Sequence, residues 1–249
     1  MATRTTEEGF LHELLERPGD DAPRLVYADW LEERGDPRAD YLRAEVARAR
    51  RPGRRAEAKA RKLAAGLDAV WVARVSRPPL GVCCDHVRFT RGGPPRTPAD
   101  LDAAEARLGA RLPPDFRAFL LNYNGGVPAP AHAPDPRYEP PAPRCLMVGV
   151  FYRSLGGTGD GDVEHELRFM RSIHREYSSA GPFPAEGLLP VASTLYDLGC
   201  LLVGIAPANF GRVIHFTDWA RSMEYPGALA DLAPSFADLL GRLGPDLDD

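Results

Sequence analysis

The stretch Leu112-Pro-Pro-Asp-Phe-Arg-Ala-Phe-Leu-Leu-Asn-Tyr-Asn-Gly-Gly126 decides the fold of this chain of 249 residues. Its two prolines favour the first turn of a helix, where a missing amide hydrogen leaves no hydrogen bond unmade. Four apolar side chains then follow at i, i+3, i+4 and i+7: Phe116, Phe119, Leu120 and Tyr123. Because this spacing puts them on one helix face, the stretch predicts a short helix packed against a larger core, and the glycine pair ends it.

Helix signals precede this stretch and strand signals follow it. Thr97 and Pro98 are typical of a helix start, and Gly109 is typical of a helix end. Further along, we expect a strand over 145–152, a helix over 163–177, a hairpin with arms at 199–205 and 212–216, and a last helix from about Ser235. Helices, then antiparallel strands, then a helix is the order of an α+β domain.

Residues 1–80 instead show apolar side chains at helical spacing throughout. Helices are predicted from Thr5, from Pro23, from Pro37 and over 54–75. Residues 82–89 predict a short strand, and Arg91–Pro95 has the composition of a linker. We therefore expect a small helical module over 1–80, a short strand and linker over 81–95, and an α+β domain over 96–249.

Charge is divided unevenly along the chain. Residues 1–40 carry 11 acidic and 5 basic side chains, residues 41–77 carry 3 and 11, and the remainder carries 21 and 15. The basic residues are expected on the outer face of the third and fourth helices: Arg43, Arg48, Arg50, Arg51, Arg54, Arg55, Lys59, Arg61 and Lys62. A basic stretch is one signature of nucleic-acid binding, but the sequence shows neither interleaved aromatic residues nor a helix-turn-helix connection. The favoured partner is the acidic first pair of helices.

The run Asp20-Asp-Ala-Pro-Arg-Leu-Val-Tyr-Ala-Asp-Trp-Leu-Glu-Glu-Arg-Gly-Asp-Pro37 resembles the bacterial repeat-companion domain. That family is a short helical module found ahead of leucine-rich repeats or other binding domains. Because no biochemical role is established for it, the resemblance implies a modular context and no activity.

Three signatures together resemble the SUKH superfamily: Leu112–Gly126, Leu188-Leu-Pro-Val-Ala192 and Gly211-Arg-Val-Ile-His-Phe-Thr-Asp-Trp219. They occur in the family's order and span most of 96–245. The superfamily includes fungal regulators of cell-wall synthesis and bacterial immunity proteins that neutralise secreted toxins, often nucleases. The resemblance implies a SUKH-like domain with an antiparallel sheet and flanking helices, and a binding fold without catalytic apparatus. The proline-rich insertion at 128–143 and the glycine-rich spacing at 156–161 depart from the family pattern.

Three patterns resemble catalytic or ligand sites and are better explained otherwise. The glycine-rich stretch 156–162 lies where a phosphate-binding loop would be, but its aspartates would repel a phosphate. The carboxylates over 160–166 resemble a calcium loop or an acid–base pair, but the helix begins too soon for that geometry. The residue types of a catalytic triad are present: Ser193, His215 and Asp197. No nucleophile elbow surrounds the serine, so we expect no enzyme, no catalytic residue, no cofactor and no metal site.

We therefore expect a binding protein whose partner is a protein, foremost a cognate toxin such as a nuclease. The alternative is an adaptor that joins two protein partners through its two parts. Candidate partner-binding residues are Asp160, Asp162, Glu164, Asp197, Asp218 and Trp219, because acidic surfaces attract basic toxins. Asp162 is also a natural cap for the helix that follows it.

Composition points to a soluble, cytoplasmic protein. No apolar run approaches the roughly 20 residues of a membrane span, and the first residues lack the apolar core of a signal peptide. The 4 cysteines show no metal-binding or disulfide-framework spacing, which favours a reducing compartment. No membrane partner is expected, and nothing in the sequence indicates the oligomeric state.

Overall fold

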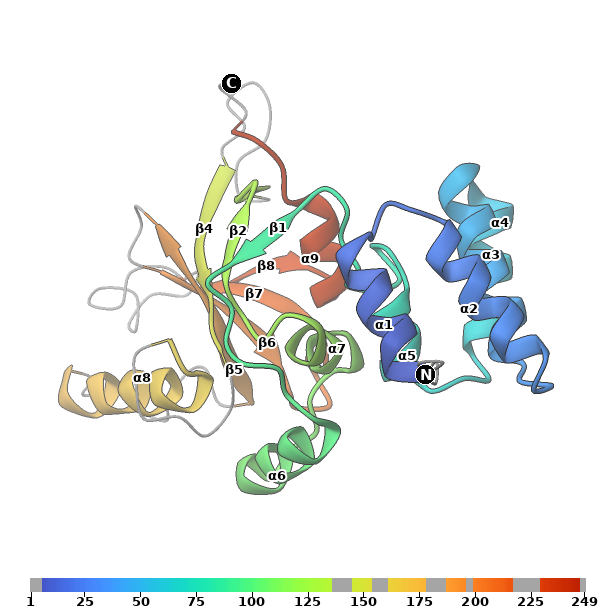
Figure 1. Cartoon of the computed structure of the whole chain (residues 1–249). Coiled ribbons are helices and arrows are strands. Elements are labelled where there is room, and N and C mark those ends of the chain that lie inside the picture. The colour runs from blue at the N-terminus through green and yellow to red at the C-terminus, as the bar shows by residue number, and fades with distance from the viewer. Residues whose placement is uncertain are drawn as a thin grey trace.

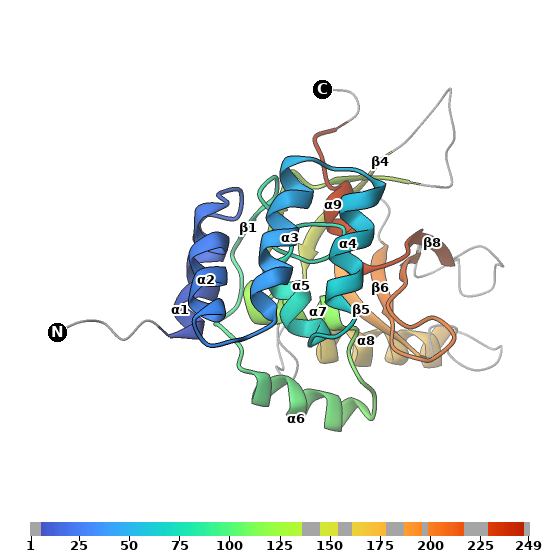
Figure 2. The ribbon, with the colours of Figure 1, turned by 90° about the vertical axis from the view of Figure 1, so that its right-hand side faces the viewer.

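The computed structural model describes residues 6–135, 145–153, 161–177, 187–195, 199–216 and 229–246. Its N-terminal helical unit consists of α1 (Glu7–Glu16), α2 (Ala22–Glu32), α3 (Arg38–Arg50), α4 (Arg54–Ala64) and α5 (Ala69–Val75). These helices lie together beside the rest of the molecule, and α5 is the one that faces it (Figures 1 and 2). A small helical module followed by an α+β domain is the architecture that the sequence predicts.

Two details of the helical unit differ from expectation. The cap of α1 is Thr6, whose side chain accepts a hydrogen bond from the Gly9 amide, and not Thr5. The helix expected over 54–75 is two helices, because the chain breaks after Ala64 and restarts at Asp68. The Asp68 carboxylate accepts a 2.6 Å hydrogen bond from the Trp71 amide and so caps α5. The restart turns α5 away from α4 and toward the second part of the chain.

Aromatic side chains fill the core of the helical unit. The rings of Phe10 and Tyr27 stack at 4.9 Å, and the Trp71 ring meets Tyr27 edge-on at 6.2 Å. Trp71 Nε1 donates a hydrogen bond to the Tyr27 hydroxyl, which in turn donates to Glu7. The polar ends of these rings are thus satisfied inside the core, as buried tyrosine and tryptophan require.

The second part of the chain is an α+β unit. Its elements are β1 (Arg88–Thr90), α6 (Pro98–Leu108), α7 (Pro114–Asn122), β2 (Val127–Ala129), β3 (His132–Pro134), β4 (Cys145–Phe151), α8 (Val163–Tyr177), β5 (Leu188–Leu195), β6 (Cys200–Gly204), β7 (Val213–Phe216), β8 (Leu229–Ala233) and α9 (Phe236–Arg242). Strands β3 to β8 form one antiparallel sheet in sequence order, and β1 pairs with β2 in a separate ribbon. The predicted helix starts at Thr97 and Ser235 are confirmed by side-chain caps on α6 and α9.

Both faces of the sheet are covered, as β6 shows most directly. All of its residues are buried, and they alternate between two hydrophobic clusters. Leu201 and Val203 belong to the large core that includes α7 and α9, whereas Cys200 and Leu202 pack with Met170 of α8 on the opposite face. A strand buried on both faces is apolar throughout, which is the pattern of residues 200–203.

The two units share a core. Helix α5 packs against α7, and Ala73 of α5 lies in the same hydrophobic cluster as Phe119 and Phe236. Arg74 and Asn122 join the two helices through reciprocal hydrogen bonds of 3.0 and 3.1 Å. The units are therefore held by apolar burial and by paired polar groups at the same contact.

The segment after α5 belongs to this shared core. The expected strand over 82–89 is a strand only at Arg88–Thr90, because the residues before it pack inward from an irregular chain: Val82, Cys84 and Val87 are all buried in the large cluster. Gly81 allows this path. A Cβ atom at this position would collide with the main-chain oxygens of Ala73 and Ser76.

All four cysteines are free, and three of them are buried. Burial raises the pKa of the Cys83 and Cys84 thiols, so neither is an activated nucleophile. Among the described helices, none combines the length and the apolar character that a bilayer crossing requires.

Candidate functional site

Two of the predicted partner-binding residues, Asp162 and Glu164, lie at the start of α8. Asp162 is only 5 % exposed, and its Oδ1 accepts hydrogen bonds from the amides of Glu164 and His165. This is the helix cap that the sequence predicts for Asp162. The Glu164 side chain is 16 % exposed and pairs with Arg107 of α6 at 3.1 Å. Both carboxylates therefore take part in contacts within the chain.

The other four candidates lie outside the described residues: Asp160, Asp197, Asp218 and Trp219. The described residues that flank two of their segments lie at one end of the sheet, where Cys200 pairs with Ser193 and with Phe216. Asp162 is beside Arg153, which follows the other end of β4. The start of α8 therefore lies at one end of the sheet. The described residues on either side of 196–198 and 217–228 lie at a different end.

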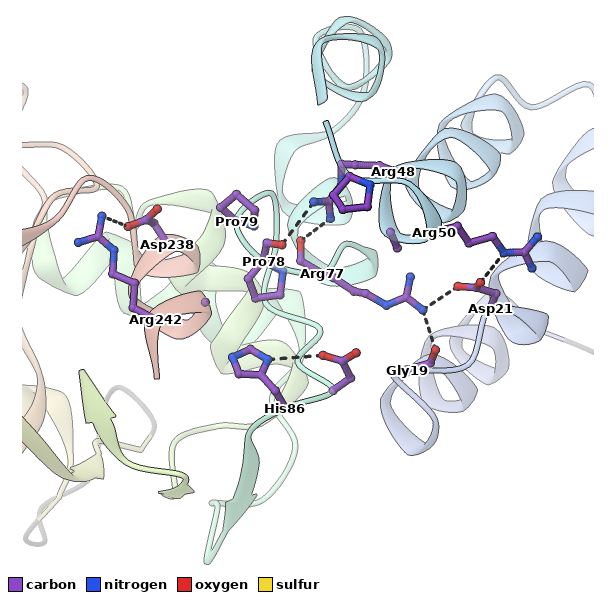
Figure 3. Close-up of a pocket in the computed structure, with 14 residues that line it drawn as sticks. Gly19, Asp21, Arg48, Arg50, Arg77, Pro78, Pro79, His86, Asp238 and Arg242 are labelled. Carbon is purple, nitrogen blue, oxygen red and sulfur yellow. Dashed lines mark hydrogen bonds and ion pairs between the residues drawn. The ribbon is translucent and has the colours of Figure 1, made fainter. Parts of the chain in front are cut away.

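A pocket of about 580 Å³ lies where the helical unit meets the α+β unit (Figure 3). The α2 and α3 ends contribute Asp21, Arg48 and Arg50, and the chain after α5 contributes Arg77. The α+β unit closes the other side with residues that include His86, Asp238 and Arg242. No single sequence motif marks this pocket, because its lining residues come from four separate segments of the chain.

Asp21 bridges Arg50 and Arg77, two of the arginines that line the pocket. Its Oδ1 accepts a hydrogen bond from Arg77 and its Oδ2 accepts one from Arg50, each at 2.8 Å (Figure 3). Arg77 also donates to the main-chain oxygens of Pro18 and Gly19. Burial alone would raise the pKa of Asp21, but the two arginines outweigh it and hold this pKa below its ordinary value.

A buried ion pair lies behind the pocket wall. Glu45 is fully buried and Arg48 is 8 % exposed, and two nitrogens of Arg48 meet the two Glu45 oxygens at 2.8 and 2.9 Å. Glu45 also accepts a hydrogen bond from the Arg77 amide, and Arg48 donates to the Arg77 carbonyl. Arg48 therefore faces inward, contrary to its expected place on the outer basic face. A charge of this kind is stable inside a protein only when fully paired.

On the α+β side, polar groups are likewise engaged. His86 Nε2 lies 3.0 Å from the Leu240 carbonyl oxygen, and its Nδ1 lies 3.4 Å from Asp85. Arg242 pairs with Asp238 one helical turn earlier on α9. The lining of the pocket is thus a set of hydrogen-bonded ion pairs, each formed within one of the two units.

The basic residues of α3 find their partners on α2. Arg43 contacts Asp29 at 2.9 Å and Glu32 at 2.7 Å, and Arg50 contacts Asp21. The prediction that the acidic first pair of helices complements the basic stretch is confirmed for these two residues. It fails for the cations of α4 and the preceding turn: Arg51, Arg54, Arg55, Lys59 and Lys62 have no ion-pair partner within the part of the chain that the structure describes.

Two of the three residues that resemble a catalytic triad are described, Ser193 in β5 and His215 in β7. Ser193 Oγ accepts a hydrogen bond from the Val150 amide, which ties β4 to β5 at a bulge. His215 is buried within β7, and Asp197 lies outside the described residues. Across the described ranges, no group of three or more histidine, cysteine, aspartate or glutamate side chains is placed to hold a metal ion.

Sequence reasoning missed Asp115, Glu45 and Arg77. Asp115 Oδ1 accepts from the Phe116 amide, and its Oδ2 accepts from the Ala237 amide. Burial raises the pKa of Asp115, although these main-chain amides act in the opposite direction. The sequence signal for Glu45 was a charged residue directly between two apolar ones, Ala44 and Val46, and all three are buried in α3. Arg77 had no distinguishing signal besides the prolines that follow it.

An antiparallel meander packed between α8 and the α7–α9 layer, with helices before it, is the architecture that the SUKH resemblance implies. The chain matches the SMI1 / KNR4 family (SUKH-1) over residues 95–242 and belongs to this family. The match leaves α1–α5 outside it. Comparison with curated proteins finds no match.

Proposed function

We propose that this protein binds a cognate bacterial toxin in the cytoplasm and neutralises it by direct contact, without catalysis. The SMI1 / KNR4 family domain over residues 95–242 carries the proposal, because the SUKH resemblance implies an immunity role. A toxin that acts on nucleic acid fits best, because its active site is basic.

The acidic candidates contribute unequally to the proposed toxin-binding surface. Asp162 caps α8 and Glu164 pairs with Arg107, so a toxin would have to compete with these contacts. The proposal therefore places most of the binding energy on Asp197, Asp218 and Trp219, because the described residues that flank them share one end of the sheet. Asp160 precedes α8, whose start lies at a different end, and is the weaker candidate. Leu195 supports this choice, because it is an exposed apolar residue directly before the segment that contains Asp197.

Co-expression with the toxin encoded by the neighbouring reading frame tests the proposal. We expect the intact protein to rescue growth and to form a complex with the toxin in gel filtration. The double variant Asp197→Arg/Asp218→Arg should lose both growth rescue and complex formation. Each substitution replaces a carboxylate with a cation, which the basic site of the toxin repels. The matched control is Glu16→Arg/Glu33→Arg, which reverses two exposed acids of the helical unit. Rescue by the Asp197→Arg/Asp218→Arg variant, or loss of rescue in the control, would contradict the assignment.

An adaptor is the second candidate function, favoured by the α4 cations Arg54, Arg55, Lys59 and Lys62, which have no ion-pair partner among the described residues. An adaptor would not rescue cells from the neighbouring toxin, but it would hold a non-toxic protein in a stable complex. The co-expression experiment therefore separates the two functions. Turnover of a substrate by the purified protein would contradict both.

A further inference from the structure

Helix α4 carries much charge and little core. It contains Arg54, Arg55, Lys59, Arg61 and Lys62 against one acidic residue, Glu57. Glu57 pairs with Arg61. Among the residues that the structure describes in α4, Ala60 is the only buried one. The packing of the unit therefore leaves most side chains of α4 free to serve another purpose.

Three of these cations lie on one face of α4. Arg55, Lys59 and Lys62 are separated by four and then three residues, the spacing of a single helix face. All three are exposed, and α4 is held to the rest of the protein mainly through α3. The helix spans about 16 Å at 1.5 Å per residue. Its outer face is thus a cationic stripe on a helix that lies beside α3 in the helical unit (Figure 2).

A shallow groove of about 430 Å³ runs beside the stripe, between α3 and α4. Ala44 and Ala47 of α3 and Ala56 of α4 provide small apolar side chains within it, while Arg51, Arg54 and Lys59 border it. An apolar floor next to a basic rim fits an amphipathic polypeptide, with one apolar side chain in the groove and carboxylates on the rim.

The neighbouring helices show what such a partner looks like. On α2, Asp29 and Glu32 are three residues apart, and both contact Arg43 of α3. Helix α4 presents cations at similar spacing, and these have no ion-pair partner among the described residues.

We propose that the cationic stripe of α4 (Arg55, Lys59 and Lys62) and the groove beside it dock an acidic amphipathic helix of a partner protein. Nucleic acid is the competing occupant of any basic surface. The apolar floor of Ala44, Ala47 and Ala56 favours a polypeptide, because a phosphate backbone has no group to place there. Helix α4 also lacks an aromatic side chain for base stacking. The docking site is independent of toxin binding, because α4 lies outside residues 95–242.

Fluorescence anisotropy with the full-length protein tests the proposal. The first ligand is a labelled helical peptide of about 18 residues built from Glu, Ala and Leu, with Glu at i and i+4 and a narrow Leu stripe. We expect saturable binding at about 50 mM NaCl that weakens at about 300 mM, because exposed charges are screened. A second peptide with Gln in place of each Glu should bind at least about tenfold more weakly.

Charge reversal locates the site. Arg55→Glu/Lys59→Glu/Lys62→Glu should weaken binding of the acidic peptide by at least about tenfold. It should also leave the fold intact, because none of the three side chains is buried. A milder variant, Arg55→Gln/Lys59→Gln/Lys62→Gln, serves the same purpose if the reversal disturbs α4. The matched control Arg88→Glu/Arg91→Glu/Arg171→Glu reverses three exposed arginines of the α+β unit and should bind like the unaltered protein.

Three results would overturn the proposal: equal binding of the Glu and Gln peptides, unchanged binding by the α4 variants, or a duplex DNA of about 20 base pairs that binds more tightly than the acidic peptide at the same ionic strength. The last result would assign the stripe to nucleic acid. Toxin rescue by the α4 variants is a separate readout, and its retention or loss leaves the peptide result standing.

Discussion

The carboxylate of Asp115 accepts a 2.9 Å hydrogen bond from the main-chain amide of Ala237, 122 positions further along the chain. Asp115 opens α7 within the signature Leu112–Gly126, and Ala237 lies in the first turn of α9. One side chain thus joins the starts of two helices that cover the same face of the sheet. The rings of Phe116 and Phe236, the next residue and the preceding one, pack beside this bond at 5.1 Å.

Replacing Asp115 should separate the effects of its hydrogen bonds and its charge. Asp115→Ala leaves the Ala237 amide without its acceptor, and we expect a loss of about 1–3 kcal/mol in the free energy of unfolding. Asp115→Asn keeps an accepting oxygen and avoids a buried charge, whose presence is the reason that burial raises the pKa of Asp115. The Asn variant should therefore retain more stability than the Ala variant. Urea unfolding of both checks this, and equal losses would contradict it.

Removing Glu45 should be among the most destabilising single changes in the helical unit. Glu45→Ala leaves the buried Arg48 guanidinium with only the more distant carboxylate of Glu57, at 3.8 Å, and we expect a loss of roughly 3–5 kcal/mol. The double variant Glu45→Leu/Arg48→Met should be more stable than Glu45→Ala, because it removes both charges and keeps apolar volume.

The matched control for Glu45 is Glu13→Ala, which removes an exposed carboxylate that pairs with Arg17 four residues later. It should lose far less stability in the same urea titration. Should Glu13→Ala and Glu45→Ala prove equally destabilising, the buried pair would have no special role.

The stability of the protein should depend on pH through Asp21. Because the pKa of Asp21 is lower in the folded chain than its ordinary value of 3.8, folding favours the charged carboxylate. The stabilisation that it provides is present above about pH 3.8 and is lost as pH falls through the folded-state pKa. The difference in unfolding free energy between the unaltered protein and Asp21→Asn should shrink over that range. A difference that stays constant from about pH 6 to about pH 3 would refute this.

The helical unit and the α+β unit should unfold together. They share the cluster that contains Ala73, Phe119 and Phe236, so loss of either exposes apolar surface of the other. In a Trp219→Phe background, tryptophan fluorescence reports on Trp30 and Trp71 of the helical unit, while far-ultraviolet circular dichroism reports on the whole chain. We expect one transition with the same midpoint by both methods. Two separate midpoints would show that the units are independent.

Much of the order of helices and strands could be predicted because local signals specify it. Strands β2, β3 and β8 were not predicted, and the first two lie in or beside the stretch 128–143 that the sequence marks as a proline-rich insertion. Thr97 and Ser235 cap helices where the sequence places them, and α8 has the predicted bounds of 163–177. The break between α4 and α5 was missed, because Leu63 and Leu67 continue the helical spacing across it. The Asp68 cap and the packing of α5 against α7 together explain why the chain turns there.

The polar network at the junction could not be predicted in the same way. Asp21, Arg77 and Glu45 become neighbours only after the helical unit has packed, and their spacing in the sequence carries no periodic signal. Charge totals did predict that α2 and α3 would pair, as Arg43 shows. They could not show which cations remain without a partner, because that depends on which side of α4 faces solvent.

The shared core between α5 and α7 also determines what the molecule does with two ligands. Because the two units share a core, a ligand at the proposed α4 site and a toxin at the proposed end of the sheet would be held at one separation. Two linked ligands whose spacing matches that separation gain avidity through effective concentration, whereas a mismatched pair gains none. The reciprocal hydrogen bonds between Arg74 and Asn122, which join α5 to α7, help to determine this separation.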